Sequence, residues 1–133
     1  MKTSKKPTEI VVYPQTNSPN NILVSEEALS EVGQVLQELM MGDYSENTKT
    51  AVVADISNFF RWYIDINNET FSFTRCLKRD CVDYKHSLIE NGKAPATINR
   101  RLSHIKIFFY KALELDFISK NPMQGVKQLP RVQ

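Results

Sequence analysis

Four segments of the chain carry apolar side chains at intervals of three and four residues, which is the period of an α-helix. No pair of segments shows the alternation of polar and apolar residues that paired strands require. The sequence therefore predicts an all-α fold, and 133 residues with 41% hydrophobic content suffice for one domain with a modest core. The expected helices run from after Ser25 to about Met41, from Ser45 to Thr48 up to about Asn67, from about Leu77 to Asn91, and from Pro95 through Ala112.

Residues that start and stop helices stand at the ends of these segments. Ser25 is a typical N-cap, and acidic residues follow it in the first turn, where the helix dipole favours them. Gly42 and Gly92 are expected to end the first and third helices, and Asn67-Asn68 the second. Pro95 suits a first turn because its missing N–H would have no partner there.

The periodicity also predicts which side chains form the core. The expected core residues are Leu29, Val32, Leu36, Leu39 and Met40, then Val52, Ile56, Phe59, Phe60 and Tyr63, then Leu77, Cys81, Tyr84 and Leu88 with Val82 and Ile89 alongside, and finally Ile98, Leu102, Ile105, Phe109 and Ala112. In the fourth helix, Ile107 and Tyr110 point away from this stripe. An exposed apolar pair often marks a surface that docks another protein.

The segments at the two ends of the chain lack this helical periodicity. Residues 1–21 are polar and contain three prolines, and we expect residues 1–24 to be flexible or extended, with only Ile10 to Tyr13 able to form a short strand. The helical domain is expected at residues 25–125. Residues 126–133 follow Asn121-Pro122 and contain Pro130, and they are typical of a linker.

Charge is distributed unevenly along the chain, although the formal net charge is only +2. Residues 22–74 hold two basic and nine acidic side chains, whereas residues 78–111 hold eight basic and three acidic ones, a local net charge of +5. Such segregation is typical of a protein with an anionic partner, most often nucleic acid. On the fourth helix Arg100 lies opposite the core stripe, and Arg101 lies nearer its edge, where it either braces the fold or reaches a phosphate.

Five short patterns occur in a fixed order. They are Ser45-x-x-Thr48, Asp55-Ile56-x-x-Phe59-Phe60-x-Trp62, Asp80-x-Val82-x-Tyr84-x-x-x-Leu88, Thr97-Ile98-Asn99-Arg100-Arg101-Leu102-x-x-Ile105-Lys106-x-Phe108-Phe109, and Asn121-Pro122. Over about residues 25–130 the chain resembles the N-terminal core-binding domain, of SAM-like helical fold, of tyrosine site-specific recombinases of the phage integrase family. The resemblance implies a domain that clamps one side of duplex DNA at the recombination core site, during DNA integration or recombination.

The resemblance also implies which parts of the chain meet DNA. The second and fourth helices are expected to approach the major groove and its flanking phosphates, and a helix N-terminus can accept a phosphate on its free N–H groups. The expected DNA-binding residues are Thr48, Lys49, Thr50, Lys93, Thr97, Asn99, Arg100, Arg101, Ser103, His104, Lys106 and Lys111. Its other implied partners are the catalytic domain of a full-length recombinase and neighbouring recombinase protomers.

Catalytic and metal chemistry are not expected in the chain as given. The spacing Cys76-x4-Cys81-x4-His86 cannot bring three ligands together, because Cys81 faces the core and His86 lies about 140° around the helix from it. His104 reads as a surface or DNA-facing side chain, since no carboxylate is expected beside it. Tyr63 and Tyr84 lie on core stripes, so they are not expected to act as nucleophiles. We expect no catalytic residue, no metal and no cofactor.

One other class of function remains open at this point. A small helical adaptor or regulator that binds protein could carry the same helices, but its cations should be scattered, whereas here they cluster on the fourth helix. No secretory signal and no membrane-spanning run are apparent, so the sequence predicts a cytoplasmic location without membrane contact.

Overall fold

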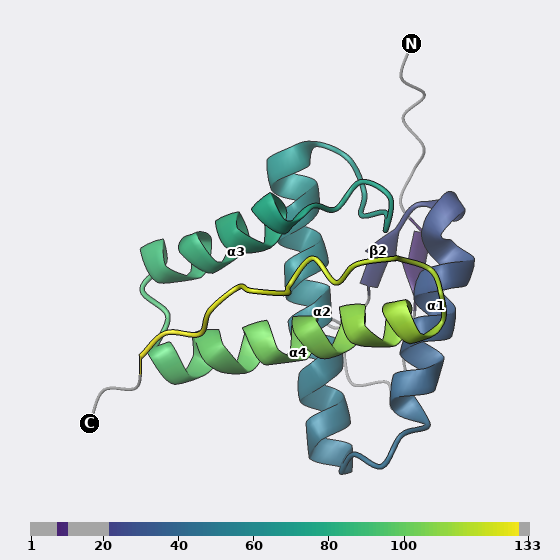
Figure 1. Cartoon of the computed structure of the whole chain (residues 1–133), viewed down its shortest axis with the longest axis horizontal. Coiled ribbons are helices and arrows are strands. Elements are labelled where there is room, and N and C mark those ends of the chain that lie inside the picture. Colours follow the sequence, from purple (N-terminus) through teal and green to yellow (C-terminus); the bar gives the residue numbers. More distant parts are fainter. Residues whose placement is uncertain (1–7, 11–21, 131–133) are drawn as a thin grey trace.

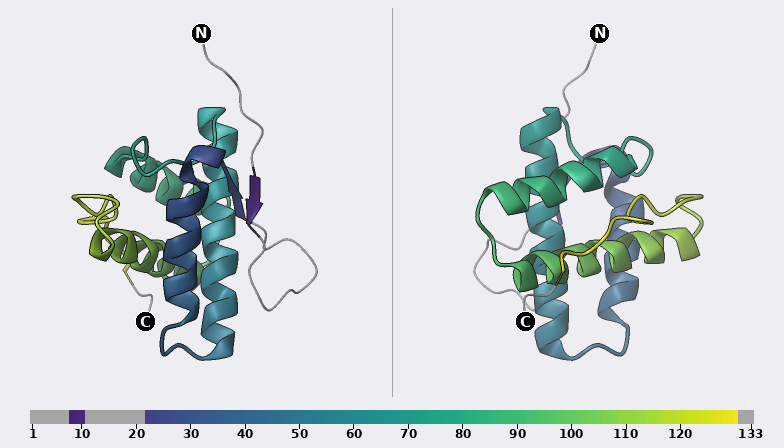
Figure 2. Two further views of the ribbon diagram at one scale, coloured as in Figure 1. Left: turned by 90° about the vertical axis from the view of Figure 1, so that its right-hand side faces the viewer. Right: turned by 60° about the vertical axis from the view of Figure 1, so that its left-hand side comes forward.

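The computed structural model describes residues 8–10 and 22–130 (Figure 1). In this part of the chain there are four helices, α1 (Glu26–Met40), α2 (Glu46–Asn67), α3 (Lys78–Glu90) and α4 (Pro95–Glu114), together with the short strands β1 (Thr8–Ile10) and β2 (Ile22–Val24). The predicted all-helical, four-helix domain is confirmed. Helices α1 and α2 lie side by side and antiparallel, and α4 crosses α2 (Figures 1 and 2).

Most predicted helix ends are confirmed by the cap geometry. The hydroxyl of Ser25 accepts a hydrogen bond from the backbone N–H of Ala28 at 3.2 Å, as an N-cap does. Asn68 and Gly92 adopt the left-handed conformation, with φ of 56° and 74°, at the ends of α2 and α3. Pro95 is the first residue of α4. The helices therefore begin and end where local sequence allows the backbone to turn.

The strand pair corrects the sequence analysis, which predicted none. Strand β1 pairs antiparallel with β2, with Glu9 opposite Leu23. Ile22 and Val24 of β2 are fully buried, and β2 packs against α2. Strands of three residues are too short to show a reliable alternation in the sequence. Of the strand expected at residues 10–13, residues 11–13 lie outside the described part of the chain.

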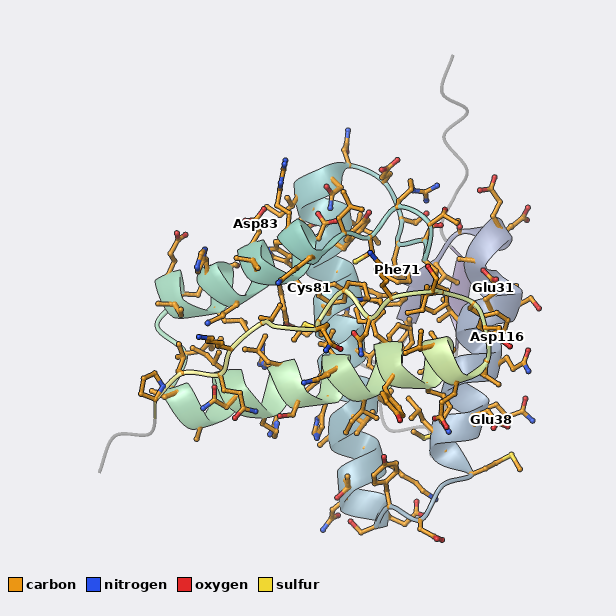
Figure 3. The ribbon with its side chains drawn as sticks, viewed as in Figure 1. Glu31, Glu38, Phe71, Cys81, Asp83 and Asp116 are labelled. Carbon is orange, nitrogen blue, oxygen red and sulfur yellow. The ribbon has the colours of Figure 1, made fainter. Side chains whose placement is uncertain are left out.

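An aromatic cluster occupies the centre of the core. Phe71 stacks on Phe60 with ring centroids 4.3 Å apart and also contacts Phe59, Phe108 and Phe109. Figure 3 shows Phe71 directed in among the helices, whereas Glu38 points outward from α1. Phe71 comes from the segment between α2 and α3, where no helical period was visible, so this connector contributes to the core that holds α2 against α4.

Four predicted positions differ in the structure. Leu29, Leu77 and Ile89, expected in the core, are exposed by 37%, 62% and 43%. Leu77 is the N-cap of α3, and its extended backbone turns the side chain off the helical stripe. Leu29 and Ile89 lie at the edges of their stripes, where neighbouring helices do not reach. Ile107, expected to be exposed, packs partly against the core, while Tyr110 is exposed as predicted.

After α4 the chain returns along that helix toward its N-terminal end (Figures 1 and 2). Asp116 reverses the direction with a positive φ of 63°. Met123 is buried, and Val126 and Leu129 pack partly against the core. We call residues 121–130 the return segment. It lies on one side of α4, so part of that helix is covered by the chain itself.

Candidate nucleic-acid interface

Three basic side chains of α4 surround one buried carboxylate. Asp55 belongs to α2, and its side chain is only 3% exposed where α2 and α4 cross. Arg100 donates two hydrogen bonds to this carboxylate, from Nη2 to Oδ1 at 2.9 Å and from Nε to Oδ2 at 3.2 Å. His104 contacts Oδ2 through Nδ1 at 2.7 Å, and Arg101 Nε lies 3.9 Å from Oδ1. A buried carboxylate needs such partners, because burying a charge without them is costly.

This cluster corrects two expectations. His104 was expected to have no carboxylate beside it, but Asp55 is that carboxylate. Arg100 was expected to lie opposite the core stripe, on the outward face of the helix, yet its guanidinium also binds a buried acid of α2. The helical period of one segment shows which residues share a face. It does not show that a second helix crosses that face and brings its own side chain into reach.

Arg100 nevertheless faces solvent with half of its side chain, which is 50% exposed. The two bonds to Asp55 use Nε and one N–H of Nη2, and a guanidinium has five N–H donors in all. The remaining N–H groups of the guanidinium can therefore donate to a second anion while Nε and Nη2 stay bonded to Asp55. A side chain fixed in this way loses little conformational freedom when it binds a phosphate.

Arg101 is used differently from Arg100. Its side chain is 17% exposed, and Nη1 donates to Asn58 Oδ1 at 3.0 Å. The hydroxyl of Tyr84 donates to the same oxygen at 2.6 Å, so Asn58 joins α2, α3 and α4. Burial raises the pKa of Tyr84 to about 12. Of the two roles left open for Arg101, these contacts favour bracing the fold.

The return segment engages two other candidates of α4. Asn99 pairs with the backbone of Leu129, donating from Nδ2 to the carbonyl oxygen at 3.0 Å and accepting from the N–H at 2.7 Å. Ser103 Oγ accepts a hydrogen bond from Gln128 Nε2 at 2.7 Å. Asn99 and Ser103 thus hold the chain against α4, and their polar groups are turned toward it.

The remaining candidates are spread over the surface. Lys93 and Lys106 are exposed, Thr97 is half-buried, and Lys111 forms an ion pair with Glu114 at 3.1 Å. The opening of α2 uses its polar groups locally. Ser45 Oγ donates to Thr48 Oγ1 at 2.9 Å, Lys49 pairs with Glu46 at 3.6 Å, and Thr50 Oγ1 donates to the Glu46 carbonyl at 3.0 Å. The structure therefore brings Arg100, Arg101 and His104 together, and leaves Thr48, Lys49 and Thr50 apart from them.

Sequence reasoning missed Asp55, Asn58 and Gln128 as members of this region. Only Asp55 carried a usable signal: it stands next to Ile56, three residues after Val52 and four before Phe59, on an apolar stripe. A charged residue on a buried stripe requires a partner of opposite charge. Asn58 and Gln128 carry no comparable signal, because their roles depend on how distant segments meet.

The residues considered for metal binding lie as follows in the structure. Cys81 is buried and His86 is exposed, as their helical positions predicted. Cys76 is also buried, and its hydrogen bond with Cys81, together with burial, raises the pKa of its thiol. None of the helices in the described residues combines the length and apolar character needed to cross a membrane.

Comparisons with known proteins agree with the resemblance described above. The family model described as "Phage integrase, N-terminal SAM-like domain" matches residues 34–114, and no catalytic domain is evident in the 133 residues. A relative named "Putative tyrosine recombinase TTE1313", from Caldanaerobacter subterraneus subsp. tengcongensis, is 31% identical over 107 residues. That match covers 80% of this chain but 36% of the relative, so the chain spans about a third of its length. No solved structure matches the chain. With its four helices and the family model agreeing over most of them, the chain belongs to the phage integrase family as an N-terminal SAM-like domain.

Proposed function

We propose that this chain is the core-binding module of a tyrosine recombinase and that it holds duplex DNA at a recombination core site. Membership of the family supports DNA binding. The observation that carries the proposal is the Arg100 guanidinium, fixed by the buried Asp55 and half exposed near the start of α4. A cation that is held in position near a helix N-terminus is well placed to bind a DNA phosphate or the edge of a guanine in the major groove.

The proposed contacts fall into two groups. Those that would touch DNA directly are Arg100, Lys93, Thr97, Lys106 and Lys111, with Thr48, Lys49 and Thr50 at the opening of α2. Arg101, His104, Asn99 and Ser103 would act mainly by holding Asp55, Asn58 and the return segment in place. The geometry of their hydrogen bonds supports this division.

The proposal extends to the protein around this module. We assign residues 25–125 to the DNA-binding unit, against which β2 and residues 126–130 pack, and we place the start of a linker within residues 126–133. Strand cleavage and rejoining would belong to a separate catalytic domain, and that domain and neighbouring protomers would be the protein partners. A cytoplasmic location with access to DNA is part of the same proposal.

Binding to duplex DNA at several salt concentrations tests the proposal. With about four to six phosphate contacts, log K should fall with log salt with a slope of about −4 to −5. Fluorescence anisotropy of a labelled duplex would give this slope. Absence of binding at low salt, or binding that salt does not change, would instead favour the protein-binding adaptor.

A further inference from the structure

A polar hollow of about 200 Å³ lies between α2, α3 and the turn before α4. Three cations from separate parts of the chain line it, namely Arg61 of α2, Lys93 of the turn and Arg101 of α4. A single carboxylate, that of Asp65, lies among the lining residues. The hollow therefore has an excess of positive charge, and most of it comes from elements other than the exposed face of α4.

Uncharged donors accompany these cations. Asn58 Oδ1 accepts hydrogen bonds from both Tyr84 and Arg101, which fixes the orientation of the amide and leaves its NH₂ group to donate elsewhere. Asn91, at the end of α3, adds a further amide to the lining.

Donors and cations around a small hollow select a compact anion rich in acceptors. A phosphate group fits this description, because its oxygens only accept hydrogen bonds and pair well with guanidinium groups. At ~30 Å³ for each water molecule, the volume of the hollow equals that of roughly six to seven waters, which is enough for a hydrated phosphate.

We propose that this hollow binds a phosphate group and that the backbone of bound DNA supplies it. The identity of the source rests on the proposed function, whereas the affinity of the hollow for phosphate does not. The proposal adds α3 and Arg61 to the DNA interface. Helix α3 was not expected to meet DNA, and Arg61, although it lies on α2, was not among the expected DNA-binding residues.

Trp62 provides the readout, because it is the only tryptophan in the sequence and it lines the hollow. Sodium phosphate would be titrated into the 133-residue chain while Trp62 fluorescence is followed, with sodium chloride at matched ionic strength as the reference. We expect a saturable change with phosphate alone. Arg61→Ala and Lys93→Ala should each weaken the apparent affinity at least threefold, and Arg79→Ala, an exposed cation outside the hollow, should not. A response equal to that of chloride, or equal effects of all three substitutions, would overturn the proposal.

A second titration with duplex DNA identifies the source of the phosphate. If the backbone enters the hollow, bound duplex changes Trp62 fluorescence, and Arg61→Ala reduces the salt slope by about one. If anisotropy shows that the duplex binds, but Trp62 fluorescence does not change and Arg61→Ala has no effect on binding, the DNA assignment is overturned and the phosphate site stands. If no duplex binds at all, the proposed function fails, and the phosphate titration alone decides whether the hollow is a site.

Discussion

Asp55 places a carboxylate where only 3% of its side chain reaches solvent, so its three basic neighbours determine whether the fold tolerates it. Asp55→Ala would leave the guanidinium groups of Arg100 and Arg101 without their carboxylate and would remove the hydrogen-bond partner of His104 Nδ1. We expect the free energy of unfolding to fall by about 2–3 kcal/mol, below the value for a fully buried pair because Arg100 is half exposed. Urea unfolding followed by circular dichroism would measure it.

The matched control for this substitution is Asp65→Ala, which removes an exposed carboxylate from the same helix. It should change the free energy of unfolding by less than about 0.5 kcal/mol. The double variant with Arg100→Ala should be less destabilised than the sum of the two single ones, because the residues share one interaction. Additive effects would show that Asp55 and Arg100 do not stabilise each other.

Tyr84 makes stability sensitive to alkaline pH. Burial raises its pKa from the usual 10.0 to about 12 in the folded protein. The unfolded chain therefore loses this proton first, and the stabilisation, complete below pH 10, disappears as the pH rises through about 12. Between pH 10 and 12 the free energy of unfolding should fall less in Tyr84→Phe than in the parent protein, and the difference should reach up to about 2 kcal/mol. Parallel pH profiles of the two proteins would contradict this.

At the scale of single elements, local sequence predicted the helices well. Periodicity and end signals such as Ser25, Gly92 and Pro95 act within a few residues, so they can be read without knowing the neighbours. Phe71 could not be placed in this way, because it enters the core from a segment without a regular period. The link between Asp55 and Arg100 depends on the crossing of α2 and α4, which no local pattern specifies.

The return segment gives a prediction for α4. Asn99→Ala removes both hydrogen bonds to Leu129, so the Leu129 amide should exchange its hydrogen about tenfold faster, the factor expected for a lost stabilisation of about 1.4 kcal/mol. Hydrogen exchange measured by NMR would test this. Ser103→Ala is the control, since it breaks only the contact with Gln128. An unchanged Leu129 amide would mean that apolar packing alone holds the segment.

At the scale of the whole molecule, DNA binding and DNA chemistry should be separable. Burial raises the pKa of Tyr63 and of Tyr84 to about 12, so neither phenol readily loses the proton that a nucleophile must give up. We expect the 133-residue chain to form no covalent adduct with a nicked core-site duplex on a denaturing gel. A shifted band that a tyrosine-to-phenylalanine substitution abolishes would contradict the assignment of cleavage to another domain.

Asn99 pairs with the peptide group of Leu129 and not with its side chain, and every residue except proline offers the same peptide group. In this contact the helix supplies the side chain, whereas the return segment supplies only its backbone. Among recombinases that keep this arrangement, the residue at position 129 should vary freely among apolar types other than proline. Position 99 should stay an asparagine, since that short side chain offers a donor and an acceptor together.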